Sequence, residues 1–287
     1  MILIIILINA LMFLYVLRKN KEGKIFKKKK RYLICILFGV IALLLALIIS
    51  SILESILSII FANYYKIVDD ELIWTNTIAK LIYYFINCFL NVALVEEVAK
   101  FLPLFFLIEN NYWERKTKYD CIIPFLVVAI IFSIIEDIVY IYSYNPESST
   151  GILRLLTELS GHIFWGLIIG IGYYKYTVKS NVESIKYGVK RLKEANKQNY
   201  NFINTGMFAD TILIIHIAIA IVLHGIFDFL AFNNFAIIIV IFSIVCTIYF
   251  IQRIVKLKNS DILLESIIKY KGYDLDATEE MIKEVLN

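Results

Sequence analysis

The sequence lacks several features that mark secreted and soluble proteins. It contains only 3 prolines and 4 cysteines in 287 residues, and no two cysteines have the C-x-x-C spacing of a redox or zinc motif. Each cysteine lies in or at the edge of an apolar run, so we expect reduced thiols that act as small apolar side chains. There is no internal repeat, and the only low-complexity segment is the lysine run Lys27–Lys30.

Charge is also scarce. Asp, Glu, Lys and Arg make up 19% of the residues and apolar residues 60%. The apolar residues form repeated runs of about 20, the length that crosses ~30 Å of hydrocarbon as a helix. The sequence therefore predicts an all-α, polytopic membrane helical bundle with about seven transmembrane helices. The net charge of +4 is concentrated in a few loops, which indicates membrane topology rather than nucleic-acid binding.

The predicted spans are Ile2–Leu17, Tyr32–Phe61, Ile78–Ile108, Cys121–Tyr144, Leu153–Tyr174, Thr211–Phe232 and Phe235–Val255. The basic residues of the first span follow it, whereas a secretory signal peptide carries them before its apolar core. Lys and Arg gather in alternate loops, which predicts an N-terminus outside and a cytoplasmic C-terminus in the plasma membrane. We expect residues 1–255 to form the bundle and residues 256–287 a polar helical tail in the cytoplasm, with a further surface helix near residues 182–192.

Three ionisable residues interrupt the third span, namely Glu96, Glu97 and Lys100. Each costs roughly 2.5–3.5 kcal/mol at the centre of a bilayer on insertion scales. They are therefore expected to pair with one another, to face a wet cavity or to carry out chemistry.

Later spans offer polar residues at helical spacing, where residues i and i+4 share a face. The pairs are Glu96 with Lys100, Phe132 with Glu136, Glu136 with Tyr140, and His224 with Asp228, and His162 heads a line of small residues through Gly166 and Gly170. We expect these faces to converge on one cavity in the outer half of the membrane, with Glu96 somewhat deeper than the others.

Two chemistries suit such a cavity. A carboxylate and an imidazole together can activate water and then protonate a leaving group. Two histidines and a carboxylate can instead hold a catalytic divalent ion, zinc being the first candidate. The sequence has no H-E-x-x-H motif, so a metal site has to assemble from separate helices.

The ordered set of motifs resembles the PrsW family of intramembrane proteases, a relative of the CAAX-prenyl endopeptidases and bacteriocin-processing membrane proteins. The resemblance covers about residues 90–229. It implies that the active-site positions are Glu96, Glu97, Glu136, His162, His224 and Asp228. It also implies cleavage of a membrane-spanning or membrane-associated protein near the outer face, an anti-sigma factor being one candidate substrate.

On this interpretation Glu96 activates water. His162 and His224 are metal ligands or proton-transfer partners, Glu136 is a further ligand or base, and Asp228 orients His224. Lys100, Phe132 and Tyr140 support the site, and His216 is expected to be structural. If no metal takes part, the protein needs no cofactor.

Two other classes of function remain open at this point. The chain can be a non-catalytic membrane assembly subunit, in which Glu96–Lys100 is a structural ion pair. It can also be a proton-coupled transporter, because buried Glu and His residues relay protons. The absence of an inverted repeat weighs against the transporter, and the number of buried Glu and His residues weighs against a purely structural subunit.

Overall fold

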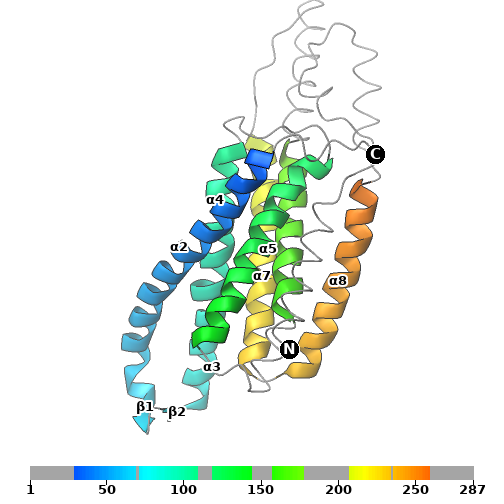
Figure 1. Ribbon diagram of the computed structural model, residues 1–287. Coiled ribbons are helices and arrows are strands. Elements are labelled where there is room, and N and C mark those ends of the chain that lie inside the picture. Colours follow the sequence, from blue (N-terminus) through cyan, green and yellow to red (C-terminus); the bar gives the residue numbers. More distant parts are fainter. Residues whose placement is uncertain are drawn as a thin grey trace, which may run out of the picture.

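The computed structural model describes residues 29–68, 71–108, 118–143, 157–177, 207–233 and 235–258. Long helices lie side by side and alternate in direction (Figure 1). They are α2 (Lys29–Phe61), α3 (Thr77–Ile86) continuing through a π-helical segment (Asn87–Ala93) into α4 (Leu94–Leu107), α5 (Lys118–Ser143), the helix formed by residues 157–177, α7 (Met207–Phe232) and α8 (Ala236–Lys258).

Within the described residues, five helical stretches are long and apolar enough to cross a membrane. They are Tyr32–Tyr64, Thr77–Leu107, Lys118–Tyr140, Thr211–Phe232 and Ala236–Lys256. The predicted all-α polytopic membrane bundle is thereby confirmed. The first predicted span, the surface helix near residues 182–192 and nearly all of the predicted tail lie outside the described residues.

The helix of residues 157–177, which we predicted as the fifth span, is not among these five stretches. It carries Glu158, His162 and several glycines, which lower its mean hydropathy. Glu158, His162 and Trp165 are all buried. This helix therefore faces neighbouring helices more than lipid, and its polar side chains find protein partners.

A short hairpin joins α2 to α3 and was not predicted. Strands β1 (Tyr65–Val68) and β2 (Glu71–Trp74) pair in antiparallel register, with Tyr65 opposite Trp74. The Trp74 ring lies 5.5 Å from that of Tyr65 and 5.0 Å from that of Tyr83, so the hairpin packs on the start of α3. Four-residue strands are too short to produce a clear alternating pattern in the sequence.

The 157–177 helix packs very closely on α5, as the predicted line of small residues requires. A Cβ atom at Gly166 would lie 2.8 Å from the Cβ of Ala129 and 3.1 Å from the backbone oxygen of Phe125. A Cβ at Gly170 would meet Ile122 at 3.0 Å. Small residues let two helix backbones approach in this way inside a membrane. The contact brings His162, one turn before Gly166, against α5.

Candidate active site

The first part of the site is the acidic and basic motif on α4. Lys100 Nζ lies 2.7 Å from Glu97 Oε1 and 3.5 Å from Glu96 Oε2, and all three residues are buried. The π-helical segment ends only three residues before Glu96. Because a π turn is wider than an α turn, it changes which face of the following helix points inward, and such segments often lie at functional sites.

His162 connects this motif to α5. Lys100 Nζ lies 2.9 Å from His162 Nδ1, and Nε2 of the same ring lies 2.9 Å from Glu136 Oε2 and 3.0 Å from Glu158 Oε1. An ammonium group only donates, so Nδ1 is the acceptor. In a neutral imidazole the proton then resides on Nε2, which donates to the two carboxylates.

His224 of α7 faces the other side of the motif. Its Nδ1 lies 2.9 Å from Glu97 Oε1, and its Nε2 lies 3.4 Å from Asp228 Oδ2 and 3.9 Å from Glu96 Oε2. When Nδ1–H donates to the Glu97 carboxylate, the lone pair of a neutral ring is on Nε2. That lone pair faces Glu96 and Asp228.

Aromatic rings enclose these polar groups. Lys100 Nζ lies 4.2 Å from the centre of the Phe132 ring, and the His162 ring is 5.3 Å from it. The Trp165 ring stacks on His224 with centroids 5.8 Å apart and planes at 17°. The ring centroids of His162 and His224 are themselves 5.3 Å apart. The walls thus fix both imidazoles and keep the site away from lipid.

The structure brings together residues from the four predicted spans that carry the motifs, the third to the sixth. Contacts link Glu96, Glu97, Glu136, His162, His224 and Asp228, with Lys100 and Phe132 in direct contact. Tyr140 is half-buried, one turn along α5 from Glu136 toward the end at Ser143. The Glu96 carboxylate lies 3.9 Å from His224 Nε2, so these two side chains meet, and the deeper position of Glu96 in the membrane stays a prediction. Depth estimated by counting from an uncertain helix start could not include the π-helical segment.

The sequence analysis did not identify two residues of the site, Glu158 and Trp165. Glu158 is 3% exposed and binds His162 Nε2 from one turn earlier on the same helix. The i, i+4 rule identifies it when applied backwards from His162. Trp165 carried no comparable signal, since an aromatic residue in a span is ordinarily packing.

Two groups of side chains have the composition and spacing of a metal site. Glu96, His162 and His224 offer ligand atoms within 4.8 Å of one another, as do Glu136, Glu158 and His162. The predicted set was His162, His224 and Glu136, and the structure instead divides these between two groups that share His162. Glu96 Oε2 is buried and has no hydrogen-bond partner among the described residues. Such an atom, beside two imidazoles, fits a divalent cation.

The fold and the site define a class of protein, namely a polytopic membrane protein with a buried centre of histidines and carboxylates drawn from four helical segments. The family model described as PrsW family intramembrane metalloprotease matches residues 27–252. The chain therefore belongs to the PrsW family, and the match extends well beyond the motif core at residues 90–229. No curated protein and no solved structure matches the chain. Family membership implies proteolysis within the membrane.

Proposed function

We propose that the protein is an intramembrane endopeptidase of the PrsW type in the plasma membrane, cleaving a membrane-spanning or membrane-associated protein. The observation that supports this best is the buried Glu96 carboxylate, which lies 3.9 Å from His224 Nε2 and forms one candidate ligand group with His162 and His224. The three residues come from three different helices, so the tertiary fold creates the group.

The residues fit a zinc ion held by Glu96, His162 and His224. Two histidines and one carboxylate are a known catalytic zinc set, which leaves a position open for water. A bound ion of this kind polarises a carbonyl group and lowers the pKa of a coordinated water. His162 offers Nδ1 to this group only when Lys100 withdraws from it. Its Nε2–H still donates to Glu136 and Glu158, and a ligating histidine typically has its second ring nitrogen bonded to a carboxylate in this way.

The chain's own residues divide the remaining work. Without a bound ion, Glu96 accepts the proton of the attacking water and passes it to the leaving amine, as a general base and then a general acid. With Glu96 on the ion, Glu136 would take that role. Glu97 accepts hydrogen bonds from both Lys100 and His224, so it orients the His224 ring and balances the Lys100 charge. Asp228 Oδ2 lies 3.4 Å from His224 Nε2, the ring nitrogen that Glu97 does not contact, so Asp228 binds the protonated ring or completes the ligand set.

The expected cut is near the outer face of the substrate's span. On α7, His224 lies about 12 Å from the end at Phe232 and about 25 Å from the end at Met207, at 1.5 Å per residue. Glu136 is placed similarly on α5, nearer Ser143 than Lys118. With the predicted orientation, the Phe232 end is the outer one, which agrees with a membrane-spanning anti-sigma factor cut outside the cytoplasm.

The test is cleavage by purified protein reconstituted with candidate single-span substrates, anti-sigma factors among them. Glu96→Gln keeps the shape but removes the carboxylate that activates water or holds the ion, so the rate should fall roughly 10²–10⁴-fold. His216→Ala and Cys88→Ala are matched controls that should retain most activity. If Glu96→Gln protein that is folded and inserted cleaves as fast as wild type, the mechanism is wrong. A metal-binding protein that cleaves none of the substrates would favour the non-catalytic assembly subunit.

A further inference from the structure

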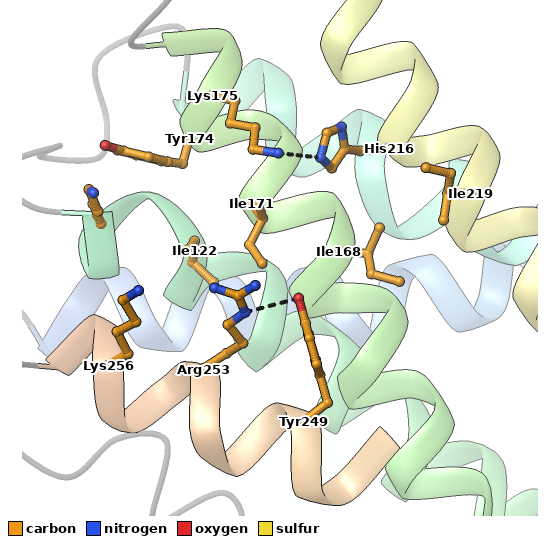
Figure 2. Close-up of a pocket in the computed structure, with 11 residues that line it drawn as sticks. Ile122, Ile168, Ile171, Tyr174, Lys175, His216, Ile219, Tyr249, Arg253 and Lys256 are labelled. Carbon is orange, nitrogen blue, oxygen red and sulfur yellow. Dashed lines mark hydrogen bonds between the residues drawn. The ribbon is translucent and has the colours of Figure 1, made fainter. Parts of the chain in front are cut away.

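A cavity of about 400 Å³ lies at the opposite end of the bundle from the hairpin (Figure 1). Figure 2 shows Tyr249, Arg253 and Lys256 of α8 on one side and side chains of the 157–177 helix and α7 on the other. Its lining residues are Lys118, Ile122, Ile168, Ile171, Tyr174, Lys175, His216, Ile219, Tyr249, Arg253 and Lys256. None of these residues belongs to the candidate active site.

The rim of this cavity is strongly basic. Lys118, Lys175, Arg253 and Lys256 come from three different helices and all lie near helix ends. No acidic side chain lines the cavity among the residues that the structure describes. Cations that converge without a carboxylate between them repel one another, and an anion placed among them removes that repulsion.

The contacts of the rim keep its cations available. Arg253 Nε donates to Tyr249 Oη at 3.0 Å, which leaves the rest of the guanidinium fork outside this bond. Lys175 Nζ donates to His216 Nε2 at 3.3 Å, and His216 Nδ1–H donates to the Ile212 carbonyl at 2.8 Å. Neither cation has a carboxylate partner in these contacts, so the bonds orient the cations without cancelling their charge.

The inner wall of the same cavity is hydrocarbon. Ile171 and Ile168 lie one and two turns before Lys175, and Ile122 lies one turn after Lys118. The apolar wall thus extends about 10 Å below the basic rim, at 1.5 Å per residue. A charged rim above an apolar wall matches a molecule with an anionic head and an acyl chain.

We propose that this cavity binds an anionic phospholipid of the cytoplasmic leaflet. Its phosphate lies among Lys118, Lys175, Arg253 and Lys256, and an acyl chain runs along the isoleucines toward the membrane interior. The positive-inside rule places this end of the bundle at the cytoplasmic face, where anionic lipids are concentrated. Arg253 suits the role because its planar fork matches phosphate oxygens in pairs. The lipid then bridges α8 to the helix that carries His162.

The test uses delipidated full-length protein in detergent and native mass spectrometry with phosphatidylglycerol or phosphatidylcholine of identical acyl chains. Wild type should retain phosphatidylglycerol at least ten-fold more strongly. The double variant Arg253→Gln/Lys256→Gln removes two exposed cations of the rim. Each loss should weaken binding about five-fold, equivalent to about 1 kcal/mol, so the double variant should bind about 25-fold less.

The matched control is Lys66→Gln/Lys80→Gln, which removes the same charge from β1 and α3, away from the cavity. It should change binding less than two-fold. Equal retention of the two lipids, or an equal loss in the control, would overturn the proposal. Inorganic phosphate or glycerophosphate that displaces phosphatidylglycerol at millimolar concentration would show an anion site rather than a lipid site, and would overturn it as well.

Discussion

Lys100 Nζ lies 2.9 Å from His162 Nδ1, across the interface between α4 and the 157–177 helix. The same ammonium lies 2.7 Å from Glu97 Oε1 and 3.5 Å from Glu96 Oε2. A cation thus already lies among the residues proposed to hold a metal ion. Lys100 can stabilise these carboxylates and set the His162 tautomer whenever the metal ion is absent.

Removing this cation should destabilise the protein. Lys100→Met leaves the Glu97 carboxylate buried without its main counter-charge, which typically costs about 3–5 kcal/mol. The double variant Lys100→Met/Glu97→Gln removes both charges and should recover part of that loss. Thermal unfolding in detergent measures both, with Lys80→Met as a control for loss of one lysine. A double variant no more stable than Lys100→Met would contradict the pairing.

Metal content provides an independent prediction. Purified protein should carry about one zinc or similar ion per chain, and His224→Ala should lose it together with activity. Glu158→Gln keeps the ligands but weakens the support of His162, so metal affinity should fall roughly 10–100-fold. Elemental analysis and chelator titration measure this, and His216→Ala should behave as wild type. Full activity after thorough chelation of a metal-free preparation would instead favour a carboxylate-and-imidazole mechanism.

The contact between α5 and the 157–177 helix predicts a difference between two glycines. At Gly166 an added Cβ would meet a backbone oxygen and a Cβ of α5, whereas at Gly161 the nearest atoms belong to Trp165 at 3.4 Å or more. Gly166→Ala should therefore destabilise by about 1–3 kcal/mol and lower activity by moving His162. Gly161→Ala should be nearly neutral. Equal unfolding temperatures of the two variants would show that α5 and the 157–177 helix can move apart at little cost, and would contradict the prediction.

Membrane orientation can be tested with single cysteines in a background that lacks the native ones. Ile67 lies on the hairpin and is 69% exposed, so Ile67→Cys offers an accessible thiol there. Asn20→Cys lies in the basic segment Arg18–Arg31, predicted to be cytoplasmic. An impermeant thiol reagent added to intact cells should label the first and not the second. The reverse pattern would overturn the predicted orientation.

The sequence was sufficient to predict the bundle, because runs such as Tyr32–Phe61 are long and uninterrupted. It also identified the residues that meet in the site, because charges inside such runs are costly and each needs a partner. Glu136, His162 and His224 could be recognised because they occur in order on successive spans, whereas none of them is informative alone.

Other features depend on tertiary structure. The π-helical segment Asn87–Ala93 leaves no clear pattern in its side chains, yet it sets the rotation of Glu96. The division of ligands into two groups that share His162 depends on how the four helices are placed relative to one another, which the sequence pattern does not specify. The hairpin forms where aromatic rings from α2, β1, β2 and α3 meet, and these rings are too irregularly spaced along the sequence to show a strand pattern.

The polar character of the 157–177 helix has a consequence for biogenesis. Glu158 and His162 on one helical face make this segment a poor candidate to enter the bilayer alone. Glu136 of α5 and Gly166, which fits against α5, provide the partners that offset that cost. We therefore expect α5 and this later helix to enter the lipid together, since each offsets the cost of the other's polar side chain.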